Sequence, residues 1–383
     1  MKTAIQPRRL AIVYPKAIGD FIFVLPALHT LRRALPETHI TLVVKKKQAP
    51  LAVPQKGVLA DEVLVLGGAG GWYHVRRQLA QINSDTMIDL AGNDQSGIIM
   101  TCRGGRRMRP DSHDCKGRCA LYSAFAEGLP RLPAGLHRVD ELLSFARCLT
   151  EAGPVYSFRL ELPARAIDLS EQMVETHNLR SGAVIALNLG ASRDAKRWPA
   201  QRFSELVREL IMAGYRVVLT GANEFKSDGN YDRHAADLLV SDGLVDGDQC
   251  INLITGHGLS PDLQLQRDTH FLRYSGVPSV IVGNDTGPMQ IAGSVGEDAV
   301  NRTISLFGPT NWGRYAPYDP SRCYPDRPSG DWNHVLYHNP ACRPDGNREA
   351  CKYYRSGCRH KQCMIDISAQ TVVEAVTSMV RKK

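Results

Sequence analysis

Short apolar runs alternate with segments of helical periodicity along the first half of the chain. The runs are residues 10–14, 39–44, 62–66 and 87–90. Their continuous hydrophobic character is typical of strands that are buried on both faces. Between the first two runs, Ile22, Leu25 and Leu28 recur at helical spacing, which predicts a helix that packs on the sheet. The alternation predicts βαβ units and therefore a parallel sheet.

The same alternation begins again in the second half of the chain. The apolar runs there are residues 183–189, 215–220, 251–254, 279–282 and 303–307. A chain of 383 residues is long for one α/β core and comfortable for two. We therefore expect an α/β protein with domains at 1–175 and 176–367, followed by a C-terminal helix at 368–383.

Two strand-to-helix turns far apart in the chain resemble each other. Residues 13–21 and residues 282–290 each follow an apolar run, carry glycine where the chain must bend, and place an Asp near a helix start. The pair predicts two α/β domains that face each other across a cleft.

The net charge of +8 favours anionic partners, which include phosphorylated small molecules, acidic lipid surfaces and nucleic acid. Basic residues cluster at 45–47 and at Arg103, Arg106, Arg107 and Arg109. Neither cluster is interleaved with the aromatic residues of a single-strand nucleic-acid surface. We therefore expect no nucleic-acid partner.

The apolar stretch near the N-terminus, residues 10–14, is too short for a signal peptide. No run approaches the roughly 18 apolar residues that a membrane-spanning helix needs. The expected location is the cytoplasm, with association at a membrane surface at most.

Asp20 is the first candidate for chemistry, because it follows Gly19 at the predicted start of a helix. An Asp at this position is most often a helix cap. At the end of a strand that faces a cleft, the same carboxylate can serve as a general base. Gly19 would let a ligand approach the backbone closely.

A second candidate lies in residues 188–199, which join a buried strand to a helix that begins near Pro199. Ser192 and nearby backbone amides can hold phosphate oxygens, with Lys196 as a mobile ammonium and Arg197 as a planar fork. A solvated basic turn is the alternative.

A third candidate is the segment 284–290, in which Asp285, Thr286 and Gly287 lead into a helix. The amides of this helix start, with the Thr286 hydroxyl, would suit a diphosphate, whereas a capping role alone is the alternative. Glu224 follows another strand and could hydrogen-bond a ribose diol.

Residues 311–348 are rich in Pro, Gly and Asp and have no periodicity, which predicts a long loop. A cysteine-rich insertion at about 323–363 overlaps this loop. The cysteines of interest are Cys342, Cys351, Cys358 and Cys363. Four thiolates within a short stretch could hold a structural zinc or iron ion, although their spacing is not that of paired CxxC knuckles. Free thiols are the alternative.

The order of these pieces resembles the ADP-heptose:lipopolysaccharide heptosyltransferase family, over most of the chain. The matching pieces are residues 17–28, 88–92, 190–192, 196–199, 284–289 and 306–310. The resemblance implies the GT-B fold, in which two Rossmann-like domains face each other across a cleft. It also implies inverting transfer of heptose from ADP-heptose without a catalytic metal.

The resemblance implies a role for each candidate residue. Asp20 matches the catalytic base, and Lys196 matches a catalytic contact to the donor phosphate. The other donor-binding residues would be Gly190, Ser192, Glu224, Asp285, Thr286, Gly287 and Gln290. Independently of the resemblance, the turn glycine and the basic clusters predict an acceptor side that comprises Gly19, Lys45, Lys46 and Arg106. The acceptor would be an anionic lipid-linked saccharide or a protein, reached at the inner-membrane surface.

Gln290 departs from the family, which usually has His at this position. An amide donates and accepts hydrogen bonds but cannot become cationic, which leaves the donor sugar open. The leading interpretation is a transferase that acts on the lipopolysaccharide inner core. One alternative is a protein O-heptosyltransferase that modifies autotransporters. Some heptosyltransferases of this kind bind iron, which favours metal at the cysteines. The other alternative is a GT-B scaffold that binds nucleotide or lipid without turnover.

Overall fold

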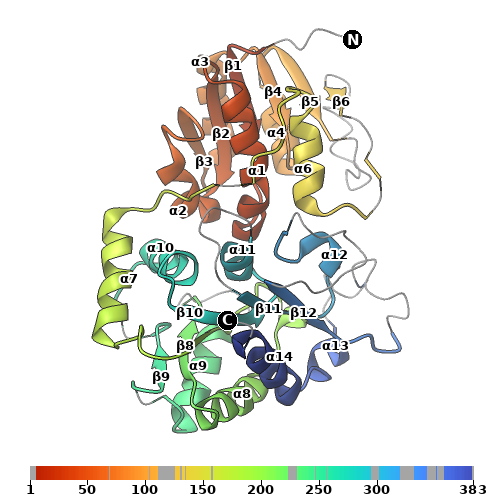
Figure 1. The fold of residues 1–383 in the computed structure, drawn as a ribbon. Helices are drawn as coiled ribbons and strands as arrows, with labels where there is room; N and C mark the ends of the chain where they lie inside the picture. Colours follow the sequence, from red (N-terminus) through yellow and green to blue (C-terminus); the bar gives the residue numbers. More distant parts are fainter. Residues whose placement is uncertain are drawn as a thin grey trace. The chain divides into compact units, whose positions relative to one another are not determined.

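The computed structural model describes residues 6–381, except 69, 103, 111–125, 130–131, 134, 157, 223–230, 246, 256, 295–301, 320–331, 343–350 and 352–357. The chain divides into two compact units, Met1–Glu161 and Leu162–Lys383. Each unit contains a parallel sheet of six described strands with helices around it (Figure 1). The predicted α/β architecture is therefore confirmed.

The first unit has the strand order β3-β2-β1-β4-β5-β6. Its strands are β1 (Arg9–Val13), β2 (His39–Lys45), β3 (Glu62–Leu66), β4 (Thr86–Asp89), β5 (Arg106–Arg109) and β6 (Glu127–Gly128). Its helices are α1 (Ile18–Ala34), η1 (Lys46–Gln48), α2 (Ala49–Ala52), η2 (Val53–Gln55), α3 (Gly71–Ile82), α4 (Asp94–Met100) and α6 (Arg138–Ala146). All the pairings are parallel, so the strands end at one carboxyl edge.

The apolar runs form the centre of this sheet because β1 pairs with β2 on one side and with β4 on the other. Side chains of the sheet, such as Val13 and Val43, pack with Val75 and Leu79 of α3. Helix α1 packs against α6 and buries the side chains that the helical periodicity predicts. The turn that holds the candidate residue Asp20 begins where the buried strand β1 stops.

The second unit has the strand order β12-β11-β10-β7-β8-β9. Its strands are β7 (Val184–Asn188), β8 (Arg216–Thr220), β9 (Cys250–Asn252), β10 (Pro278–Asn284), β11 (Arg302–Phe307) and β12 (Asn333–Tyr337). Its helices are α7 (Ala164–Thr176), η3 (Asp194–Lys196), α8 (Ala200–Met212), α9 (Tyr231–Ser241), α10 (Pro261–Arg273), α11 (Gly287–Gly293), α12 (Trp312–Tyr315), α13 (Gln362–Ile365) and α14 (Ala369–Arg381).

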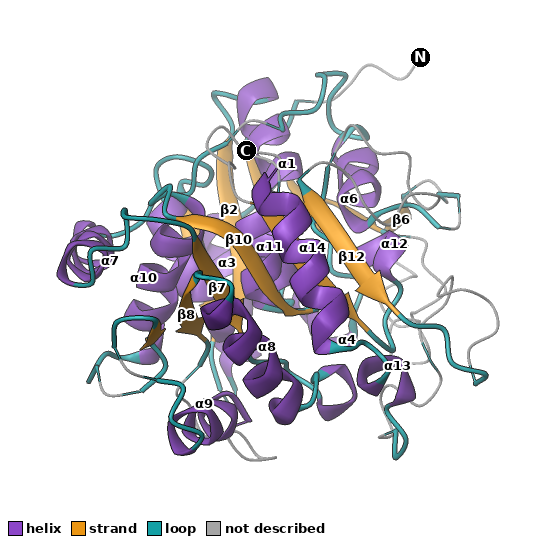
Figure 2. Cartoon of the chain, turned by 60° about the horizontal axis from the view of Figure 1, so that its bottom comes forward, coloured by secondary structure: helices purple, strands orange, loops and turns teal. Residues whose placement is uncertain are grey.

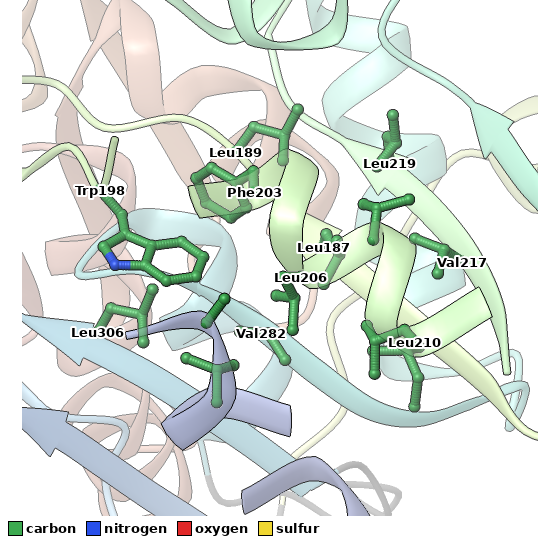
Figure 3. Packing of buried hydrophobic residues seen from close by; sticks show 14 of the residues in the cluster. Leu187, Leu189, Trp198, Phe203, Leu206, Leu210, Val217, Leu219, Val282 and Leu306 are labelled. Atoms are coloured by element: carbon green, nitrogen blue, oxygen red, sulfur yellow. The ribbon is translucent and has the colours of Figure 1, made fainter. Parts of the chain in front are cut away.

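Two hydrophobic clusters cover the two faces of the second sheet. One contains Trp198 and the apolar faces of α8, α9 and α14, and Figure 3 shows its centre. Helices α8 and α14 pack against each other in this layer (Figure 2). The other cluster joins the sheet to α7, α10 and α11. The indole Nε1 of Trp198 donates to the carbonyl of Ile367 at 2.9 Å, which ties the start of the last helix to the core.

The two compact units divide between Glu161 and Leu162, and Met173 and Val174 of α7 pack with α10 in the second unit. One expectation about the elements needs correction: the predicted loop 311–348 contains α12 and an edge strand, β12, which pairs with β11. The basic segment around Arg106 forms strand β5. Among the described residues, no helix is long and apolar enough to cross a membrane.

Candidate functional site

The turn after β1 brings Asp20 to the carboxyl edge of the first sheet, in the first turn of α1. The Asp20 Oδ2 accepts a hydrogen bond from the backbone N–H of Ala17 at 3.2 Å, so the carboxylate does cap the helix. Its Oδ1 has no hydrogen-bond partner among the residues that the structure describes. Capping therefore leaves one carboxylate oxygen for a second role. Gly19 lies in the same helical turn.

A buried cation that the sequence analysis did not single out, Arg138, lies close to this turn. The Arg138 guanidinium forms an ion pair with Glu141 at 2.7 Å, donates to the Leu90 carbonyl at 2.8 Å, and lies 6.0 Å from the Tyr14 ring centroid. Burial raises the pKa of the Tyr14 hydroxyl above its ordinary value. The Asp20 carboxylate contributes to the electrostatic environment of both Tyr14 and Arg138.

The predicted acceptor residues fall into two groups. Lys45 ends β2 at the carboxyl edge, where burial lowers the pKa of its ammonium and the Asp20 carboxylate opposes that shift. Lys46 follows and is exposed. Arg106 instead begins β5 at the amino edge and forms an ion pair with Glu127 at 2.7 Å. The structure therefore brings Lys45 and Lys46 near Asp20 and separates Arg106 from them.

An ion pair dominates the carboxyl edge of the second sheet. The Lys196 Nζ lies 2.5 Å from the Asp285 Oδ2, and both side chains are largely buried. The Thr310 hydroxyl donates to the same oxygen at 2.6 Å. The sequence proposed Lys196 as a mobile ammonium, whereas the structure shows it held by Asp285.

Buried amides connect the turns after β7 and β10. The Asn284 Nδ2 donates to the carbonyls of Leu189 and Gly190 at 2.9 and 3.1 Å, and its Oδ1 accepts from the Trp198 N–H at 3.0 Å. The Thr286 hydroxyl donates to the Asn188 Oδ1 at 3.1 Å. These contacts bring Gly190, Lys196, Asp285 and Thr286 together, next to the start of α11 at Gly287. Ser192 lies in the same turn with an exposed side chain.

Asp232 is a buried acid at this edge that the sequence did not single out. It lies at the start of α9, and its Oδ2 accepts from the Ala222 N–H at 2.8 Å. A Cβ atom at Gly190 would lie 2.2 Å from that same oxygen. Glycine is therefore required at 190 by the close approach of the carboxylate. Glu224, the predicted ribose contact, lies outside the described residues.

We expect Gly190→Ala to destabilise the protein by roughly 1–3 kcal/mol, because the added methyl group overlaps the Asp232 carboxylate. Asp232→Ala removes the obstacle, so the double variant should be more stable than the sum of the two single effects predicts, by about 0.5–3 kcal/mol. Denaturant unfolding of the four proteins in this cycle measures the coupling. Gly153→Ala, where the methyl group meets open space, is the control. Strict additivity would contradict the overlap.

Gln290 is buried and links two helices. Its Nε2 donates to the Tyr315 carbonyl at 2.6 Å, which ties α11 to the end of α12. Its Oε1 is buried with no hydrogen-bond partner in the described part of the chain. The side chain that replaces the usual His of the family therefore has a structural contact of its own.

The four cysteines predicted to bind zinc or iron are not assembled. Cys363 is buried against Gly308 and Met364, whereas Cys342 is exposed. The Cys358 Sγ accepts from the Lys361 N–H at 3.4 Å. Among the described residues, which include all four cysteines, no three His, Cys, Asp or Glu side chains are grouped as metal ligands. The described residues therefore give the predicted metal site no support, and one of its thiols, that of Cys363, belongs to the core.

The chain matches known proteins both in sequence and in structure. The family model "Glycosyltransferase family 9 (heptosyltransferase)" matches residues 72–324. A family 9 glycosyl transferase from Veillonella parvula superposes with a TM-score of 0.72 at 20% identity, covering 98% of each chain. E. coli ADP-heptose lps heptosyltransferase II gives 0.67 at 18% identity, covering 98% of this chain and 99% of the other.

E. coli heptosyltransferase WaaC with ADP gives a TM-score of 0.62 at 17% identity, covering 98% of each chain. These likenesses establish the fold of both units as that of the GT-B glycosyltransferases. No curated protein sequence matches this chain.

Proposed function

Since the chain belongs to glycosyltransferase family 9, the heptosyltransferases, we propose that it transfers heptose from ADP-heptose to the lipopolysaccharide inner core. The observation that carries this proposal is the cluster of Lys196, Asp285 and Thr286 at the carboxyl edge of the second sheet. In open α/β sheets, ligands bind outside the carboxyl ends of the strands. The Lys196 ammonium and the backbone N–H groups that follow Thr286 at the start of α11 are groups that bind phosphate.

The reaction assigned to these residues is a single displacement with inversion. Asp20 takes the proton of the acceptor hydroxyl as its oxygen bonds to the anomeric carbon of the heptose. The bond between that carbon and the phosphate oxygen breaks, and ADP leaves with the electron pair. The Lys196 ammonium stabilises the charge that develops on the departing diphosphate. No step requires a catalytic metal.

Donor binding is proposed to give Lys196 a second partner beside Asp285. Asp285 holds the ammonium in place before the donor arrives, so little side-chain entropy remains to be lost on binding. The diphosphate then shares the ammonium with Asp285, whose Oδ2 keeps the hydrogen bond from Thr310. Gly190, Ser192, Gly287 and Gln290 complete the proposed donor side, together with Glu224.

The proposed acceptor is the anionic inner core, presented at the cytoplasmic surface of the inner membrane. Lys46 is exposed at the same edge as Asp20 and offers its ammonium to acidic groups. Lys45 and Gly19 lie beside the base. Arg106 is a weaker candidate because Glu127 already neutralises it at the other edge. A protein acceptor is the alternative, and the described residues show no metal-ligand group that would favour it.

The direct test is an assay of the purified protein with ADP-heptose and lipopolysaccharide truncated before its first heptose. We expect release of ADP and a mass increase of one heptose in the saccharide. Mass analysis of envelope proteins from cells with and without this chain is the parallel measurement. Heptose on those proteins and none on the saccharide would overturn the acceptor assignment, and no transfer to either would favour the non-catalytic scaffold.

A further inference from the structure

The side chain of Gln48 joins two backbone segments at the carboxyl edge of the first sheet. Gln48 ends η1 and is fully buried. Its Oε1 accepts from the backbone N–H of Lys45 at 2.9 Å and from that of Lys16 at 3.1 Å. Both neighbours are donors, so the atom between them must be the amide oxygen. The Nε2 is buried without a hydrogen-bond partner among the described residues.

The two N–H groups belong to neighbouring strand ends. Lys16 lies in the turn after β1 that leads to Asp20, and Lys45 is the last residue of β2. On the other side of β1, the Asn93 Nδ2 donates to the Pro15 carbonyl at 3.3 Å. Asn93 caps α4, which follows β4. Because β2 and β4 both flank β1, amides from the two adjacent loops hold the turn from opposite sides.

The hydrogen bond from Lys16 to Gln48 is linked to Asp20 through only one further residue of the backbone. Gln48 fixes the Lys16 N–H, the next residue is Ala17, and the Ala17 N–H donates to the Asp20 Oδ2. Rotation of the turn backbone would move the Ala17 N–H and release the carboxylate from its present position. Displacement of a catalytic group by about 1 Å can cost on the order of 100-fold in rate.

We infer that Gln48 is a positioning residue for Asp20, supported from the β4 side by Asn93. The inference rests on the proposed role of Asp20 as the general base. Gln48 acts through the backbone of the turn and does not touch the substrates. Its contribution is to hold the base in the orientation that its reaction with the acceptor hydroxyl requires.

Two substitutions separate this role from a general loss of stability. Gln48→Met keeps the volume of the side chain but removes the side-chain acceptor of two part-buried N–H groups. The Lys16 N–H then keeps only its bond to the Tyr14 carbonyl at 3.0 Å. Gln48→Glu keeps an oxygen acceptor for both N–H groups and replaces the Nε2, which has no partner in the described structure, with a carboxyl oxygen. Thr38→Val is the matched control, because it removes a buried hydrogen bond to the Pro7 carbonyl at the amino edge of the same sheet.

The experiment measures kcat and KM for both substrates, ADP affinity and thermal stability, with ADP-heptose and heptose-free lipopolysaccharide. We expect Gln48→Met to lower kcat by roughly 10- to 100-fold. Its ADP affinity should stay within about twofold, because the proposed donor residues lie in the other unit. Gln48→Glu should restore most of the rate, and Thr38→Val should lose stability without losing kcat.

Asn93→Asp provides a second measurement if Gln48→Met does not fold. An Asp keeps the cap of α4, where the Asn93 Oδ1 accepts from the Ser96 N–H at 3.0 Å, but it cannot donate to Pro15. Its kcat should also fall, with unchanged ADP affinity. Wild-type kcat in both Gln48→Met and Asn93→Asp, or Gln48→Glu as slow as Gln48→Met, would overturn the positioning role. Full activity of Asp20→Asn would instead overturn the base assignment itself.

Discussion

Asp20→Asn is expected to lower kcat by on the order of 100- to 10,000-fold, the usual cost of losing a general base. Affinity for ADP should stay within about twofold, because the proposed donor residues belong to the second sheet. An Asn side chain can still accept the hydrogen bond from the Ala17 N–H, so the helix cap is preserved. The substitution therefore isolates proton transfer from capping.

Calorimetric titration with ADP and a transfer assay on the same purified variant measure the two quantities. Asp20→Ala is the companion variant, since it removes both the base and the cap. The stability lost between the Asn and Ala variants should be about 1 kcal/mol, the typical value of a cap. A variant Asp20→Asn that transfers heptose at the wild-type rate would leave the carboxylate as a helix cap only.

Lys196→Met is expected to reduce both donor affinity and kcat. The ammonium contacts the diphosphate in the ground state under this proposal and contacts it more strongly as ADP leaves, so the loss in kcat/KM should exceed the loss in affinity. Removal of one electrostatic stabiliser of this kind typically costs about 100- to 1,000-fold in kcat. The variant also leaves the Asp285 carboxylate without its cation in a largely buried position.

The double variant Lys196→Met/Asp285→Asn distinguishes the structural role of the ion pair from its catalytic role. Loss of one partner of a buried pair can cost about 3–5 kcal/mol, whereas removal of both charges costs much less. The Asn side chain can still accept from Thr310. We expect the double variant to regain thermal stability but not transfer activity. Recovery of transfer together with stability would show that Lys196 serves the fold and not the chemistry.

The apolar pattern was sufficient to locate the central strands of both sheets. Strands such as β1 and β10 are paired on both sides and covered on both faces, so their residues must be apolar almost without interruption. The same pattern did not find β5, a basic strand beyond β4, or β12, a polar strand at the edge of its sheet. Strands near an edge are less constrained by burial, so their sequences carry a weaker signal.

The candidate site residues were likewise predictable only in part from the sequence. Local sequence placed Asp20, Lys196 and Asp285 at strand-to-helix turns, because glycine and a helix start mark such turns within a few residues. It also identified the basic cluster 45–47, which follows the apolar run 39–44. The family resemblance then assigned roles to these positions.

Only the tertiary structure decided which of these residues meet. Each of these contacts joins segments that different strands bring to the carboxyl edge of their own sheet. In the second sheet they are the Lys196–Asp285 pair and the approach of Asp232 to Gly190. In the first sheet it is the hydrogen bond between Gln48 and Lys16. The cysteines show the converse, since close spacing in the chain did not group three or more of them in the part of the chain that the structure describes. A sequence determines local conformation through short-range periodicity and turn chemistry, whereas side-chain partners depend on the strand order, which arises from contacts across the whole unit.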